Sequence, residues 1–189
     1  MAQARPPKRV KPIVGILSED PDLMDRAAHH LSQQVGPIDL ISDTWDFDFT
    51  DYYAAEMGAD LKRRFVCMEE LVYPDRLGDL KRLSNDLEGL ICKECAVDRE
   101  HRPVNLDPGY ITLSSLVLAS MKDYSHRVYL GRGVYAQVTL LYEHGAWRSL
   151  PWTYPDYASA HYQAFFSTVR EHLKSQISAA LADSPAKGR

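Results

Sequence analysis

Cysteine is scarce in this chain of 189 residues, and long apolar runs are absent. Its three cysteines are an odd number, which cannot form a closed set of disulfides. No apolar run approaches the roughly 20 residues that a membrane-spanning helix needs. The basic first residues lead only into a short apolar run at 13–17, too short for a secretory signal. We therefore expect a cytoplasmic protein without a membrane segment.

Several short motifs of known chemistry are also missing. The chain has no GxxxxGK[ST] phosphate loop, no GxSxG nucleophile elbow and no HExxH zinc motif. Cys92 and Cys95 have CxxC spacing, but a zinc site needs about four ligands and no second CxxC exists. A redox pair would open a helix after a strand, whereas this pair comes late in a helical pattern. We expect ordinary reduced thiols and no metal site, and no motif indicates a cofactor.

The composition that remains is typical of a soluble globular domain, with 45% hydrophobic and 25% charged residues. This length suits one domain with a sizeable core. We predict a flexible arm at 1–10, a single domain over 11–182 and a disordered tail over 183–189. The net charge of −4 argues against general nucleic-acid binding, which usually needs a basic surface. Nothing in the pattern indicates the oligomeric state.

Strand and helix patterns alternate in the first half of the chain. A buried strand is predicted at 13–17, then a helix that Asp20 caps and Pro21 opens. A strand over 38–41, which continues into the aromatic residues 45–49, and a strand at 61–71 are predicted next. A leucine-rich helix from 74 to about 90 and a short strand at 104–106 follow. This order matches the split βαββαβ pattern of ferredoxin-like folds.

The second half reads mainly as strands. Residues 112–121 fit a helix or a strand, with the helix slightly favoured. Strands at 128–130 and 134–142 flank a Gly131-Arg132-Gly133 turn, and a final helix is expected over 157–181. The predicted class is α+β, with a ferredoxin-like βαββαβ core extended by an antiparallel β-meander and a C-terminal helix.

A first candidate for chemistry is Asp107-Pro108-Gly109, followed by Tyr110. These residue types are typical of a turn, because Asp accepts backbone bonds, Pro presets φ and Gly permits a positive φ. The functional alternative places the Asp107 carboxylate at a strand end beside Tyr110, as an acid/base or metal ligand.

The polar run at 122–127 is a second candidate. His126 can move protons near neutral pH, and Asp123 can orient it. Arg127 can clamp a carboxylate or phosphate, with Lys122 adding charge. In a strand His126 and Arg127 would face opposite sides, so both join one site only if the segment is a loop or a bulge. The alternative is an ordinary charged connection.

Aromatic residues supply a third set. Trp152, Tyr154 and Tyr157 can stack on a ligand ring or pack over the hairpin as part of the core. Tyr52, in the acidic aromatic stretch before residue 58, is a further candidate for a pocket wall. Asp156 is expected to cap the last helix.

These motifs together resemble the bacterial and archaeal family called domain of unknown function 4416. The resemblance covers about residues 11–175 and rests on five segments: FDFTDYY with Glu56-Met57-Gly58, VNLDPGY at 104–110, KDYSHR at 122–127, Gly133-Val134-Tyr135-Ala136 with Val138-Thr139-Leu140, and PWTYPDY at 151–157. Family members often carry Glu at the position of Gln137. Some are labelled GTP-binding proteins, but the phosphate loop of a GTPase is missing here.

Two hypotheses follow. In the first, the protein binds, and as an enzyme transforms, a small anionic or phosphorylated ligand. The catalytic candidates are His126, Asp107 and Asp123; the ligand-binding candidates are Tyr110, Lys122, Arg127, Tyr52, Trp152 and Tyr154. In the second, the protein is a noncatalytic interaction module that uses exposed aromatic turns. Convergence of the polar side chains in one pocket would favour the first hypothesis.

Overall fold

The computed structural model describes residues 3–95 and 101–182; the predicted tail at 183–189 lies outside them. The strands are β1 (Lys11–Ser18), β2 (Ile38–Ile41), β3 (Trp45–Asp46), β4 (Lys62–Met68), β5 (Asn105–Ile111), β6 (Ser115–Ser120), β7 (Val128–Gly131), β8 (Val134–Glu143) and β9 (Ala146–Ser149). The helices are α1 (Pro21–Gln34), α2 (Ala54–Met57), α3 (Leu77–Glu94) and α4 (Ala160–Ala182), with a 3₁₀ turn (Pro74–Arg76) before α3.

All nine described strands join one antiparallel sheet, in the order β2-β4-β1-β5-β6-β8-β7, with β3 beside β4 and β9 beside β8. The first four positions, β2-β4-β1-β5, together with α1 and α3, form the predicted split βαββαβ core. The later strands extend this antiparallel sheet, with β6 paired to one edge of β8 and both β7 and β9 paired to its other edge. The α+β class is therefore confirmed.

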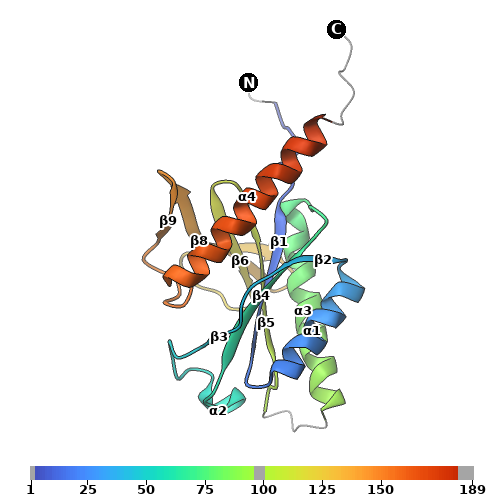
Figure 1. Cartoon of the computed structure of the whole chain (residues 1–189), viewed down its shortest axis with the longest axis vertical. Coiled ribbons are helices and arrows are strands. Elements are labelled where there is room, and N and C mark those ends of the chain that lie inside the picture. Colours follow the sequence, from blue (N-terminus) through green and yellow to red (C-terminus); the bar gives the residue numbers. More distant parts are fainter. Residues whose placement is uncertain (1–2, 96–100, 183–189) are drawn as a thin grey trace.

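Helices cover both faces of the sheet. Figure 1 shows α1 and α3 side by side on one face and α4 crossing the other. Strand β1 is buried along its whole length and supplies both layers. Because side chains alternate along a strand, Val14 and Ile16 pack with α1 and α3, whereas Ile13 packs with Phe65 and the α4 aromatics. Strand β1 thus lies at the centre of a three-layer structure.

Helix starts show one confirmed cap and one correction. The Asp20 carboxylate accepts a hydrogen bond from the Asp22 amide at 2.8 Å, and Pro21 opens α1 as predicted. The prediction that Asp156 caps the last helix is wrong, because α4 begins at Ala160. Asp156 is buried instead, and its carboxylate lies 3.7 Å from the Arg63 guanidinium.

Two further predictions are wrong near the centre of the sheet. Residues 115–120 form strand β6 rather than a helix, because they pair with β5 on one edge and with β8 on the other. Asp107-Pro108-Gly109 is not a turn but the middle of β5, in register with β1. Tertiary pairing outweighed the local preferences of both segments.

Pro108 explains why β5 and β6 separate. The two strands pair only from Gly109–Leu118 to Ile111–Leu116. The next residue of β5 is Pro108, which has no N–H to donate to a ladder, so pairing ends there. Gly109 permits the last close approach, since a Cβ at that position would lie 2.4 Å from the Val117 carbonyl oxygen.

Side chains of α3 cover the backbone edge that β6 leaves open. The Leu106 amide donates to Glu88 Oε1 at 2.6 Å, and the Leu106 carbonyl accepts from Lys81 Nζ at 3.0 Å. Buried backbone groups without partners are costly, so these two bonds stabilise the separated strand. On the Pro108 side of Gly109, β5 and β6 therefore stay apart, and the space between them forms part of a cavity.

Candidate functional site

A cavity of about 760 Å³ lies in this gap. Its walls come from β4, β5 with Arg102 before it, β6, the 121–127 loop, α3, the 47–56 segment and the 154–157 loop. We call its most buried part the inner end (Arg63, Asn105, Asp107, Asp156) and its most exposed part the mouth (Tyr52, Lys122, Arg127, Tyr154). Where β5 and β6 separate, residues from segments far apart in the sequence thus line one cavity.

At the inner end, a buried arginine lies between two carboxylates. The Arg63 side chain is 2% exposed; its Nη1 donates to Asp107 Oδ2 at 2.8 Å, and its Nη2 lies 3.7 Å from Asp156 Oδ2. Gly15 of β1 makes room for it, because a Cβ there would lie 2.9 Å from Arg63 Nη1. A buried guanidinium needs such partners to remain charged.

Asp107 and Asp156 respond differently to this surrounding. Burial opposes ionisation of Asp107, but the charges of Arg63 and Lys81 and the bonds from Arg63 and Asn105 outweigh it, so the pKa of Asp107 lies below its usual value. Burial raises the pKa of Asp156, and Arg63 only partly opposes that rise. Asp107 therefore stays a carboxylate at neutral pH, which suits a hydrogen-bond acceptor better than an acid catalyst.

A polar chain continues from Asp107 towards α2 and α3. Asn105 Nδ2 donates to Asp107 Oδ2 at 2.8 Å, and Arg102 Nη1 donates to Asn105 Oδ1 at 2.9 Å. Arg102 also lies 3.3 Å from Glu56 Oε2 and 3.7 Å from Glu88 Oε2. Burial raises the pKa of Glu88, with the Lys81 charge opposing it. The cations of this region thus all have carboxylates near them.

At the mouth, the hydrogen-bond partners of Arg127 among the described residues are all neutral. Its Nε donates to Gln137 Oε1 at 2.9 Å, and its Nη1 donates to Ser120 Oγ at 2.9 Å and to the Lys122 carbonyl oxygen at 2.7 Å. Its Nη2 donates to the Tyr154 hydroxyl at 2.8 Å. The 121–127 segment is a loop between β6 and β7. The side chains of His126 and Arg127 therefore need not face opposite sides, as they would in a strand.

Lys122 stands beside it with an aromatic partner. Its ammonium donates to the Tyr52 hydroxyl and lies 4.6 Å from the Tyr52 ring centroid. No carboxylate of residues 3–95 or 101–182 lies within ion-pair distance of Lys122 or Arg127. Two positive charges therefore face the same wall of the cavity without an opposite charge in contact.

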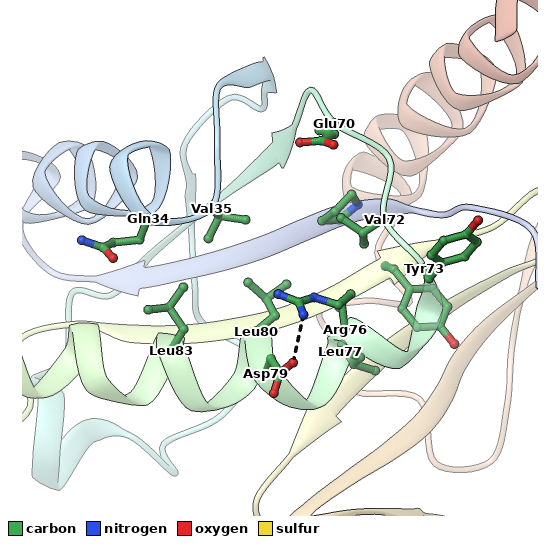
Figure 2. Close-up of a pocket in the computed structure, with 13 residues that line it drawn as sticks. Gln34, Val35, Glu70, Val72, Tyr73, Arg76, Leu77, Asp79, Leu80 and Leu83 are labelled. Atoms are coloured by element: carbon green, nitrogen blue, oxygen red, sulfur yellow. Dashed lines mark ion pairs between the residues drawn. The ribbon is translucent and has the colours of Figure 1, made fainter.

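The structure gathers five of the predicted site residues in this cavity: Asp107, Lys122, Arg127, Tyr52 and Tyr154. Tyr110 does not join them, because it lies an odd number of residues from Asp107 along β5 and faces the other side. It lines a smaller hollow of about 400 Å³ beside α3. Figure 2 shows that hollow, in which Arg76 and Asp79 pair at 3.5 Å.

His126, Trp152 and Asp123 are not among the lining residues. The His126 ring stacks on Trp152 with 5.0 Å between centroids and 6° between planes, and its Nε2 lies 3.2 Å from Gln137 Oε1. Trp152 Nε1 donates to the Val138 carbonyl at 2.8 Å, on the edge of β8 between β7 and β9. Asp123 is exposed. These three residues therefore do not form part of the cavity wall.

Several lining residues were missed at the sequence level, chiefly Arg63, Lys81, Asn105 and Asp156. The signal for Arg63 was present: in a strand it faces away from Lys62 and Arg64, so it points inward while its neighbours point outward. Lys62, one of these outward neighbours, pairs with Asp46 at 2.9 Å. Lys81 lies on the buried face of α3 among leucines, where sequence alone gives no reason for a cation.

A family model described as "Domain of unknown function (DUF4416)" matches residues 8–173. The chain therefore belongs to that family, and the resemblance seen in the sequence is confirmed. Neither the curated proteins nor the solved structures include a match. Within the described ranges, no helix is long and apolar enough to cross a membrane, and no group of three or more His, Cys, Asp or Glu side chains is placed to hold a metal ion.

Proposed function

We propose that the cavity between β5 and β6 binds a small anionic ligand, with Arg127 and Lys122 as its charge partners. The observation that carries the proposal is the lack of a contacting carboxylate for these two cations among the described residues, although both line a cavity. Arg127 is held by four neutral acceptors. Such bonds fix the orientation of the guanidinium and leave its charge available for a carboxylate or phosphate.

The proposal is for binding rather than catalysis. His126, the predicted proton carrier, stacks on Trp152 and does not line the cavity. Asp107 stays ionised and already accepts two hydrogen bonds on Oδ2. A cytoplasmic location accords with the three cysteines, which form no disulfide among the described residues. General nucleic-acid binding is not part of the proposal, because the net charge is −4.

The test begins with a thermal-shift screen of phosphorylated and carboxylated metabolites, because a ligand that binds the folded state raises the melting temperature. A compound that shifts it is then titrated against wild type, Arg127→Lys, Arg127→Ala and Arg148→Ala. We expect Arg127→Ala to weaken binding about tenfold or more, since a charge-assisted bond contributes about 1.5–3 kcal/mol. Lys should restore part of the affinity.

Arg148→Ala is the matched control, because Arg148 lies on β9 outside the lining and pairs with Glu143 at 3.1 Å. Its affinity should equal that of the wild type. Equal affinities for all four proteins would contradict a role for Arg127.

A second candidate function has its own observation. Strand β7 lies at the edge of the sheet, and its Val128, Tyr129 and Leu130 side chains are exposed. Exposed apolar edges pair readily with another strand. If the protein is a noncatalytic interaction module, a second copy pairing along β7 is the simplest partner. Sedimentation of wild type against Tyr129→Ser and Leu130→Ser tests this: concentration-dependent association should be lost in both variants, and a wild type that stays monomeric contradicts it.

A further inference from the structure

The two ends of the cavity differ in charge, and this difference bears on the kind of anion that fits. Two cations at the mouth, Lys122 and Arg127, have no carboxylate in contact among residues 3–95 and 101–182. Glu56 lies at the rim, with its side chain 54% exposed. Further in, the described lining residues comprise three carboxylates, Glu88, Asp107 and Asp156, and three cations, Arg63, Lys81 and Arg102. The cavity is thus positive at the mouth and balanced in formal charge further in.

Of the two carboxylates beside Arg63, Asp107 is the better placed to meet a ligand. Its side chain is 25% exposed, whereas that of Asp156 is 6% exposed. Both of its hydrogen bonds reach Oδ2, from Arg63 and Asn105, and Oδ1 has no partner in the described part of the chain. A carboxylate oxygen accepts about two hydrogen bonds, so an ionised group lining the cavity retains acceptor capacity on Oδ1.

A second polar atom beside the inner end also lacks a partner among the described residues. The Tyr157 hydroxyl is buried, and it has no hydrogen-bond partner there. Tyr157 lines the cavity next to Asp156. Buried hydroxyls nearly always have a partner, so the described side chains leave hydrogen-bonding capacity unused in this region.

Tyr154 connects the two ends. Its hydroxyl accepts a bond from Arg127 Nη2 at 2.8 Å. Burial raises the pKa of Tyr154, the Arg127 charge opposes the rise, and the Asp107 charge adds to it, so this side chain interacts with both charged groups. Arg127, Tyr154 and Asp107 all line the same cavity, so a ligand in it can face both charged groups.

We infer that the ligand is a small zwitterion, with an anionic group at Lys122 and Arg127 and an ammonium group at Asp107, joined by a short spacer. This inference rests on the proposed function and specifies its ligand class. An ammonium group offers three donors, which suits the free oxygen of an ionised carboxylate. The opposite orientation would place the anion against Asp107 and the ammonium against two cations.

The experiment compares matched pairs of probes by calorimetric titration of the wild-type protein. The amino probes are phosphoethanolamine, 3-aminopropyl phosphate and 4-aminobutyl phosphate, and each is paired with the alkyl phosphate of the same length. For the spacer that fits, the amino compound should bind about tenfold tighter or more, as expected of a charge-assisted bond. No variant is needed for this comparison, so it does not depend on a mutant that folds.

Asp107→Asn then identifies the group responsible. In this variant the amino and alkyl compounds should bind within about threefold of each other, while Glu143→Gln, outside the cavity lining, should keep the preference. Circular dichroism establishes that each variant is folded. If Asp107→Asn does not fold, Asp107→Glu replaces it, and a changed spacer preference is expected because the carboxylate is displaced.

The outcomes separate the two proposals. If no phosphate compound binds, the proposed function fails for phosphates. If alkyl phosphates bind and are weakened by Arg127→Ala, yet no amino compound binds tighter, the proposed function stands and the zwitterion is overturned. A preference for amino compounds that persists in Asp107→Asn would overturn the assignment to Asp107.

Discussion

Arg63 and Arg127 line the same cavity but have opposite electrostatic surroundings. Arg63 is 2% exposed and lies between Asp107 and Asp156. Arg127 donates to an amide, two hydroxyls and a carbonyl, all neutral. The first arginine supports the fold, because removing it would leave Asp107 and Asp156 without their ion-pair partner. The second orients a charge that the fold leaves unbalanced, and this difference distinguishes a structural cation from one available to a ligand.

The largest effect is expected for Arg63→Met. Breaking a buried ion pair by removing one partner typically costs about 3–5 kcal/mol, and here both Asp107 and Asp156 lose theirs. Chemical denaturation should show a loss of this size, against a loss below about 1 kcal/mol for Arg127→Met. Similar losses for the two variants would break the comparison.

The next effect separates the two carboxylates beside Arg63. Asp107→Asn should cost about 1.5–3 kcal/mol at pH 7, since it weakens charge-assisted bonds. Asp156→Asn should cost less, because burial already disfavours its ionised form. Since the folded pKa of Asp107 is lowered, its contribution is present above the ordinary value near 3.9 and is lost as the pH falls through the lower folded pKa.

This pH dependence is measured by denaturation between pH 7 and pH 2. The gap between wild type and Asp107→Asn should narrow below about pH 4. A gap that is independent of pH would show that the charge of Asp107 is not its source.

Gln137→Glu tests the comparison of the two arginines by giving Arg127 a carboxylate partner. Gln137 is 3% exposed, and its Oε1 accepts from Arg127 Nε at 2.9 Å. A carboxylate of the same shape would give Arg127 the counter-charge that Arg63 already has, so an anionic ligand should bind about tenfold more weakly or worse. Gln137→Met, which removes the acceptor without adding charge, is the control. Unchanged affinity in Gln137→Glu would contradict the role assigned to the unbalanced charge.

The smallest effect is expected for Cys92→Ser and Cys95→Ser, at the end of α3. Neither residue lines the cavity. Substitutions outside the core and outside buried polar networks usually change stability by less than about 0.5 kcal/mol. Folding, ligand binding and metal content, measured by mass spectrometry, should match the wild type. Stoichiometric zinc that the variants lose would contradict the interpretation as ordinary thiols.

Periodicity was enough to predict the core of the fold, because β1, α1, β4 and α3 have local patterns that agree with their final places. It failed for β6 and for the centre of β5. Leu116, Val117 and Leu118 fit a helix or a strand, and only pairing with β5 and β8 decides between them. Pro108 and Gly109 favour a turn in isolation, but their use here is to end one strand pairing.

For the site, charged loop residues such as Lys122 and Arg127 stood out because polar loops commonly carry function. Arg63 and Lys81 did not, because a cation within a strand or helix is ordinarily expected at the surface. Their burial depends on Asp107, Asp156 and Glu88, which come from distant parts of the chain. No local pattern contains that information.

The missing N–H of Pro108, which ends the pairing of β5 and β6, has a consequence for the entropy cost of ligand binding. Two walls of the cavity are strands of one continuous sheet, and α3 bonds both polar groups of Leu106 in place. These walls exist before any ligand arrives, so little conformational freedom of the main chain remains to be lost on association. The free and the ligand-bound protein should then have nearly the same backbone conformation. Affinity is then set mainly by how well a molecule fits the preformed cavity and by the free energy of removing its hydration water.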